Sequence, residues 1–321
     1  MTPIRLMLLA CLGLLVADVA WAQDKSPLPA GKMSAAQLLV AADAGRADAQ
    51  YAAAALILMG GMPANANRVL RDSGEADALA VKYLRGAAAQ GHAPAQHLLG
   101  TLYLSGRGVS ADPVQAKDLF LSAVASGNTD AQNALGQMLR KGLGGARDDK
   151  AAVAWFEKSA AGGNMLALTN LAYMHGAGLG VPKDEAKALE LTMRAAAAQV
   201  PEAQHNLGVM YYEGKGTAKS TPDAVAWYRR AAEQGYSPSA LNVGFIYAKG
   251  EVGGEVRGQL VEAVKWFALA ATSTEDRVRE TARKALSYVA ERAPPDVMLD
   301  GSDAAQKWSL RRQVSANASG N

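Results

Sequence analysis

A repeat of 36 residues restricts the fold of this chain more than any other feature of its sequence. The segment AQHLLG begins at Ala95, and its counterparts follow in steps of 36 residues at Ala131, Ala167, Ala203 and Ser239. An earlier copy begins at Ala49 and is ten residues longer, with the extra residues between Gly60 and Gly74. Three other series keep the same step: Gly106, Gly142, Gly178, Gly214 and Gly250; Tyr83, Leu119, Trp155, Leu191 and Trp227; Ala80, Ala116, Ala152, Ala188 and Ala224. This self-similarity predicts a tandem array whose copies pack on their neighbours.

Each copy contains two helical patterns. In the first, Ala95, Leu99 and Leu102 follow the spacing of one helix face. In the second, for example residues 223–234, Trp227 lies on one stripe with small alanines. Of the 321 residues 67 are alanine and only 6% are aromatic, which favours closely packed helices over one large globular core. Small residues are expected where two helices cross, and the position of Gly208 is expected to tolerate only glycine or alanine.

Glycines mark the predicted turns. A Gly-x-Gly pair between the two helices of a copy, such as Gly106 and Gly108, predicts a tight reversal with positive φ. A second series ends the second helices in the left-handed conformation, and it consists of Gly91, Gly127, Gly163 and Gly235. Gln199 stands where this series would require a further glycine.

These positions resemble the Sel1-like repeat family, which is related to the tetratricopeptide repeats. The family pattern is A-x-x-x-L-G-x-x-Y-x-x-G-x-G-V, followed by D-x-x-x-A-x-x-W-x-x-x-A-A-x-x-G. The copy at Ala95 fits it with Tyr103, Gly106, Gly108 and Val109. The resemblance covers residues 41–271 and implies an all-α fold, a right-handed α-solenoid (superhelix) of stacked helix-turn-helix repeats that serves as a protein-interaction scaffold.

The repeat pattern and the ends of the chain predict six segments. The N-terminal segment contains a basic residue, Arg5, then a short apolar run and Ala20-Trp21-Ala22. This order is typical of a secretory signal peptide. We therefore expect a signal peptide at 1–22, a flexible leader at 23–33, an N-terminal capping helix at 34–48, six repeats at 49–274, C-terminal capping helices at 275–314 and a disordered tail at 315–321.

Export to the periplasm with cleavage after Ala22 is the location that this N-terminus predicts. A lipoprotein attached through Cys11 is the alternative, because residues 8–11 resemble a lipobox. No second apolar run of spanning length follows, so we expect no transmembrane segment.

Charge and composition count against several functional classes. The formal net charge is +3 and the basic residues form no dense block, so we expect no nucleic-acid partner. The single cysteine excludes a disulfide framework and a cysteine zinc site. His97 and His205 occupy the same position three repeats apart, too far to bind one metal ion. Because the sequence contains no catalytic signature, we expect no enzyme, no cofactor and no metal.

A partner-binding surface is predicted on the first helices, which line the concave face in tetratricopeptide arrays. The position shared by His97, Asn133, Thr169, His205 and Leu241 varies in chemistry, which favours outward side chains. The predicted partner-binding residues are His97, Thr101, Asn133, Gln137, Arg140, Lys141, Tyr173, His205, Tyr212, Phe245 and Lys249. The loop from Gly61 to Gly74 is a second candidate contact.

The leading hypothesis is a monomeric, non-catalytic scaffold of the bacterial cell envelope that binds another protein or peptide. A regulator of envelope signalling, an assembly factor and an immunity protein that neutralises a periplasm-delivered toxin are the roles considered. The opposing class is a cell-wall-modifying enzyme or a β-lactam hydrolase. The cysteine pairs of the family branch that has been linked to β-lactams are absent from this sequence.

Overall fold

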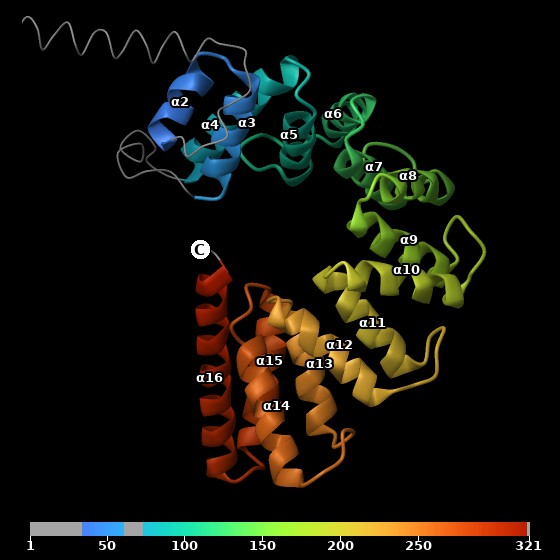
Figure 1. The fold of residues 1–321 in the computed structure, drawn as a ribbon, viewed down its shortest axis with the longest axis vertical. Helices are drawn as coiled ribbons and strands as arrows, with labels where there is room; N and C mark the ends of the chain where they lie inside the picture. Colours follow the sequence, from blue (N-terminus) through green and yellow to red (C-terminus); the bar gives the residue numbers. More distant parts are fainter. Residues whose placement is uncertain (1–33, 61–72, 320–321) are drawn as a thin grey trace, which may run out of the picture. The chain divides into compact units, whose positions relative to one another are not determined.

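The computed structural model describes residues 34–60 and 73–319, and it contains α-helices and no strand within these ranges (Figure 1). The predicted signal peptide and leader, and most of the long loop before Gly74, lie outside the described residues. The chain divides into two compact units, residues 1–164 and 165–321. Within the described residues of the first unit the helices are α2 (Ala35–Asp43), α3 (Ala47–Leu58), α4 (Ser73–Ala89), α5 (Ala93–Ser105), α6 (Pro113–Ala125), α7 (Thr129–Lys141) and α8 (Asp149–Ala161).

The second unit continues the same alternation of paired helices. Its helices are α9 (Met165–Ala177), α10 (Glu185–Ala197), α11 (Pro201–Glu213), α12 (Thr221–Glu233), α13 (Ser237–Ala248), α14 (Val256–Ala270), α15 (Asp276–Ala290) and α16 (Pro295–Ser319). In each unit, every helix up to α14 packs against the one that follows it in the chain, and both α15 and α16 pack against α14. The predicted all-α solenoid of stacked helix pairs is confirmed.

The predicted glycine turns are confirmed by the backbone. Gly106 and Gly108 have φ values of +70° and +69°, and the equivalent pairs in α7–α8, α9–α10 and α11–α12 have the same conformation. Gln199 keeps the left-handed conformation with φ of +62°, and it is the one non-glycine residue with positive φ among the described residues. The turn geometry is therefore retained where the glycine is lost.

The second helices α6, α8, α10 and α12 begin at a polar N-cap that also recurs every 36 residues. The side chains of Asp112, Asp148, Asp184 and Ser220 accept hydrogen bonds from the first free backbone N–H groups of their helices. The backbone N–H of each of these four residues donates to a carbonyl near the end of the preceding helix, at 2.8–3.0 Å. The cap thus fixes both the start of the second helix and the closure of the turn.

An aromatic ring packs against a glycine inside four of the six pairs. A Cβ atom placed on the glycine would come within 2.5–2.7 Å of the ring, which leaves no space for a side chain. The four contacts are Gly100 with Phe120, Gly136 with Phe156, Gly208 with Tyr228, and Gly244 with Phe267. The repeat pattern highlights Trp155 and Trp227, but these rings are half-buried and the fully buried ring is the next residue. Alanine at the position of Gly208 would therefore clash, contrary to the expectation from sequence.

Both ends of the described chain carry additional helices. Ser34 and Gln37 form a reciprocal capping box at the start of α2. The helix expected near residues 276–292 is α15, and α16 follows from Pro295. Residues 315–319, expected to be disordered, continue α16. Within the described residues, no helix combines the length and hydropathy that a bilayer crossing requires.

Candidate functional site

A pocket of about 370 Å³ opens in the second unit between α9, α10 and α11. Helices α9 and α10 line it mainly with small side chains, and α11 contributes Asn206, Val209 and Met210. Tyr173 lies on its border, and its side chain is 54% exposed. Tyr173 belongs to the predicted partner-binding set, so the pocket joins one residue of that set to several that sequence reasoning did not select.

The pocket lies where this pair departs from the packing of the others. Thr192 occupies the sequence position of the buried rings Phe120, Phe156 and Tyr228, and Ala172 occupies the position of the glycines that face them. Both residues line the pocket. The missing ring, which the methyl group of Ala172 replaces only in part, accounts for the cavity.

The two threonine hydroxyl groups in the pocket are bound within their own helices. Thr192 Oγ1 donates to the carbonyl of Ala188 at 2.7 Å, and Thr169 Oγ1 donates to that of Met165 at 3.4 Å. Both threonines are buried. Since their donors are satisfied, these side chains present mainly their methyl groups to other contacts.

Charged groups line the exposed side of the pocket. Lys183 Nζ lies 2.7 Å from Glu185 Oε1, and Lys215 Nζ lies 2.5 Å from Oε2 of Glu213. The hydrogen bond from Lys183 lowers the pKa of Glu185, and the charge of Lys215 adds to this effect. The lining residues therefore include two ammonium groups and one carboxylate, and all three side chains are accessible to solvent.

The position predicted to project outward in the first helices is largely interior. Asn133 and Thr169 are 7% and 5% exposed, and His97 is half-buried with its ring centroid 5.6 Å from that of Phe120. Burial lowers the pKa of His97, an effect that the charge of Asp130 opposes. The variety at this position follows from differing neighbours in each pair rather than from exposure to solvent.

His205 takes the same interior position in the second unit. Its ring lies between Tyr228 and Tyr236, with centroids at 5.3 and 5.1 Å, and its Nδ1 lies 2.8 Å from Ser239 Oγ. Burial lowers the pKa of His205 to about 4. The imidazole is therefore neutral at pH 7 and packs as part of the core.

The remaining predicted residues of the first unit lie on α5 and α7. Thr101 is exposed and its hydroxyl donates to the carbonyl of His97 at 3.1 Å, while Gln137 is half-buried. Arg140 is half-buried and Lys141 is exposed at the end of α7. Partner contact by these side chains stays a prediction.

Three predicted residues of the second unit are accessible at the ends or surfaces of α11 and α13. Phe245 is 36% exposed and packs edge-to-face on Phe267, with centroids 5.1 Å apart. Tyr212 donates to Glu251 at 3.1 Å and accepts from Lys249 at 3.3 Å. The hydrogen bond with Tyr212 raises the pKa of Lys249.

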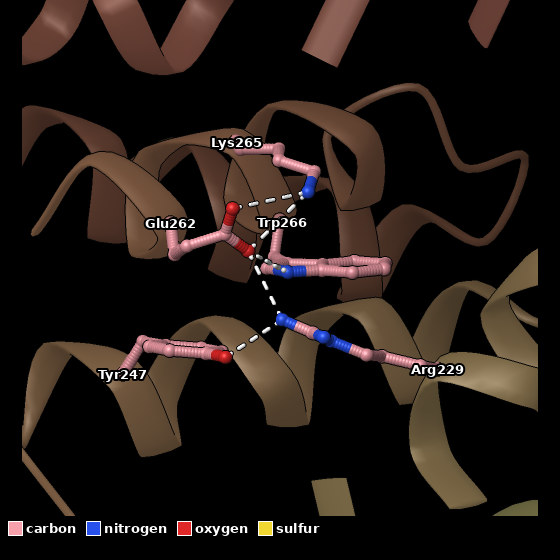
Figure 2. Close-up of polar contacts among 5 residues, drawn as sticks. All are labelled: Arg229, Tyr247, Glu262, Lys265 and Trp266. Atoms are coloured by element: carbon pink, nitrogen blue, oxygen red, sulfur yellow. Dashed lines mark hydrogen bonds and ion pairs between the residues drawn. The ribbon is translucent and has the colours of Figure 1, made fainter. Parts of the chain in front are cut away.

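A polar cluster joins α12, α13 and α14 (Figure 2). Arg229 Nη2 donates to Tyr247 Oη at 2.6 Å and to Glu262 Oε2 at 3.3 Å. Glu262 also accepts from Lys265 at 3.1 Å and from the indole N–H of Trp266 at 2.9 Å. Because three donors from two helices meet one carboxylate, this cluster holds α12 and α13 against α14.

The structure groups no metal-ligand set among the residues that it describes: no three His, Cys, Asp or Glu side chains there could hold one ion. The histidine with the most strongly shifted pKa, His205, contacts aromatic and hydroxyl groups of the core. The second unit instead holds an apolar pocket bordered by charged and aromatic side chains.

Sequence reasoning missed the pocket residues Ala172, Thr192, Asn206, Val209 and Met210 as candidates. The signal that could have identified them is the pairing of two positions 20 residues apart, which is glycine with a ring in three of the copies and Ala172 with Thr192 in this one. Each helix taken alone shows an ordinary apolar stripe.

Comparisons with known proteins agree with the repeat pattern. The Sel1 repeat family matches residues 93–128, 129–164, 166–200, 201–236 and 237–274. A Sel1 repeat protein from Oxalobacter formigenes is similar in structure, with a TM-score of 0.60 and 25% identity over 71% of this chain and 90% of that one. The protective antigen c5321 of uropathogenic Escherichia coli, which displays an SLR fold, has a TM-score of 0.53 and 23% identity over 88% of this chain and 65% of that one. No curated protein matches the sequence.

Proposed function

The chain belongs to the Sel1 repeat family, a protein-interaction fold, and on this premise we propose that it is a non-catalytic scaffold that binds a partner protein or peptide. The observation that carries the proposal is the exposure of aromatic side chains on the first helices of the second unit. Tyr173 is 54% and Phe245 is 36% exposed, whereas the apolar residues that follow them, Met174 and Ile246, are buried. Accessible aromatic residues dominate the affinity of many protein interfaces.

The binding surface in this proposal includes Tyr173, Phe245 and the cluster of Tyr212, Lys249 and Glu251. The hydrogen bonds of this cluster hold the ring of Tyr212 in place before a partner arrives. A side chain that is already ordered loses less conformational entropy on binding. Aromatic groups flanked by surface charges suit an extended segment or a helix of another protein.

The absence of catalysis is part of the proposal and is supported by the roles of the titratable groups. His205 is neutral and packs between two tyrosines, and Glu262 receives donors from Arg229, Lys265 and Trp266. Turnover of a cell-wall or β-lactam substrate by the purified protein would contradict this proposal.

The bacterial cell envelope is the proposed location, on the basis of the signal peptide expected at residues 1–22. Mass spectrometry of the native protein should find a mature N-terminus at Gln23. A lipidated N-terminus at Cys11 would establish the lipoprotein alternative, and an intact Met1 would refute export.

The test of function begins with affinity capture from envelope extracts and continues with titration of the purified partner. Replacing Tyr173, Tyr212 and Phe245 together by alanine should weaken binding by about 2–4 kcal/mol or more if they act as anchors. Tyr288→Ala is the matched control, because Tyr288 is 61% exposed on α15, outside the repeat helices that carry the three anchors. A folded triple variant with unchanged affinity would show that the partner binds elsewhere. The identity of the partner then distinguishes regulation, assembly and immunity.

A further inference from the structure

We propose that the pocket between α9, α10 and α11 receives one aromatic side chain of the partner protein, an inference that rests on the proposed function. The pocket has a volume of about 370 Å³ and is lined mainly by apolar and small residues. Protein sites for compact apolar groups have this volume range and this kind of lining.

The repeat itself specifies an aromatic ring at this place. In the other pairs that keep the glycine, the ring of Phe120, Phe156, Tyr228 or Phe267 lies against the facing helix. The fold therefore provides the shape of a ring site in every such pair. In the α9–α10 pair Thr192 leaves that site without its own ring, and the space opens as a pocket.

The surfaces that a partner's ring would touch are apolar and aromatic. Met210 and Val209 line the side formed by α11, and Tyr173 borders the pocket from α9. Thioether and aromatic groups both make favourable contacts with an aromatic ring. Ala172 takes up less space than a bulky residue but more than the glycine of the other pairs, so the ring would enter less deeply than Phe120 or Tyr228 does.

The charged groups beside the pocket carry a net positive charge. Two lysines, Lys183 and Lys215, and a single acidic residue, Glu185, line the pocket. The two lysine side chains are 61% and 57% exposed. Exposed ion pairs of this kind contribute little stability, so either lysine can exchange its present carboxylate for one on a partner at little cost. The occupant that fits best is an aromatic residue of the partner with an acidic residue next to it.

The test uses capped amino acids as probes and the full mature chain. N-acetyl-phenylalanine amide should shift the methyl NMR signals of Met210 and Val209 through its ring current, with saturation in the millimolar range expected for a single side chain. N-acetyl-leucine amide should bind at least about tenfold more weakly. Phenylacetate represents a free aromatic acid, and tighter binding of phenylacetate than of the capped phenylalanine would overturn the assignment to a protein side chain.

Two variants test whether the probe binds in this pocket, one that fills it and one that keeps its shape. Ala172→Gly with Thr192→Phe copies the pairing of the other repeats and should fill the pocket, so the probe-induced shifts should disappear. Thr192→Val keeps the shape of the side chain and should bind the probe as the original chain does. If the original chain shows no saturable shift, or if the filled variant shows the same shifts, the proposal is wrong.

The affinity of the captured partner for these two variants distinguishes this proposal from the general scaffold function. Its affinity for the filled variant should be reduced at least about tenfold, and it should be unchanged for Thr192→Val. Equal affinity for the filled variant would overturn the pocket proposal and leave the scaffold function intact. If no partner binds at all, the scaffold function fails, while the probe titration still decides whether the pocket accepts a ring.

Discussion

Gly208→Ala should destabilise the second unit, although alanine is the better helix former. A Cβ atom at Gly208 would lie 2.7 Å from two ring atoms of Tyr228, and Tyr228 is only 2% exposed, so the ring cannot move away into solvent. Overpacking of this kind costs about 1–3 kcal/mol. The higher helix propensity of alanine returns about 1 kcal/mol.

With a strain near the upper part of that range, we expect a net loss of about 1–2 kcal/mol. For a unit of this size the loss corresponds to a decrease in Tm of about 2–8 °C, measured by calorimetry on the mature chain. Gly258→Ala is the matched control, because Gly258 lies in α14 with no atom near its Cβ position. That change should leave Tm unchanged or raise it.

A double-mutant cycle isolates the contact between the ring and the glycine. In a Tyr228→Thr background the chain resembles the Ala172–Thr192 pair, so Gly208→Ala should become neutral or stabilising there. The expected coupling is about 1–3 kcal/mol. A higher Tm for Gly208→Ala with Tyr228 present, or the same loss in both backgrounds, would refute the reasoning.

Three further changes have expected outcomes. Gln199→Gly should raise stability by about 0.5–1 kcal/mol in thermal unfolding, because it relieves a positive φ of +62° at the expense of the hydrogen bond from Gln204; a lower Tm would show that the hydrogen bond dominates. His205→Leu should reduce the loss of stability between pH 6.5 and pH 4. The folded pKa of about 4 lies below the unfolded value of 6.5, so the unfolded chain binds the extra proton in this window, which costs the original chain up to about 3 kcal/mol of stability. The free energy of unfolding of both proteins is measured at pH 7 and pH 4.5, and an equal decrease in the two proteins would contradict this expectation. Glu262→Ala should cost about 1–3 kcal/mol in urea unfolding because it removes the carboxylate shared by Arg229, Lys265 and Trp266 and leaves Arg229 only its bond to Tyr247. Glu251→Ala should change stability by less than about 0.5 kcal/mol, and equal effects of the two changes would argue against the cluster in Figure 2 as a stabilising element.

The turns and the pairing of helices could be predicted because each depends on residues close together in the sequence. The glycines at 106 and 108 are enough to predict positive φ, and the conformation at Gln199 follows from its alignment with the equivalent glycines of the other repeats. The buried ring was less accessible to such reasoning. Trp227 and Tyr228 are neighbours near the edge of one apolar stripe, and only the facing helix decides which of them enters the core.

The candidate site depended on contacts between helices, which the spacing within one helix does not encode. His97 and His205 look like surface residues because their position varies, yet each ring packs on an aromatic neighbour of its own pair. Likewise, Ala172 and Thr192 are unremarkable alone and define a pocket only as a pair. Tyr173 and Phe245 could be selected from sequence as exposed aromatic residues, and the structure gives both of them accessible rings.

The contact between ring and glycine has a consequence for how such a chain can change its length during evolution. Gly208 and Tyr228 both lie within residues 201–236, one complete family repeat. A duplication of that segment copies both members of the contact at once, so the new copy can pack internally from the start. Contacts between pairs, such as that of Arg229 with Tyr247, must instead be adjusted afterwards by substitution. Arrays of this kind should therefore grow and shrink in whole repeats more readily than they exchange single core residues.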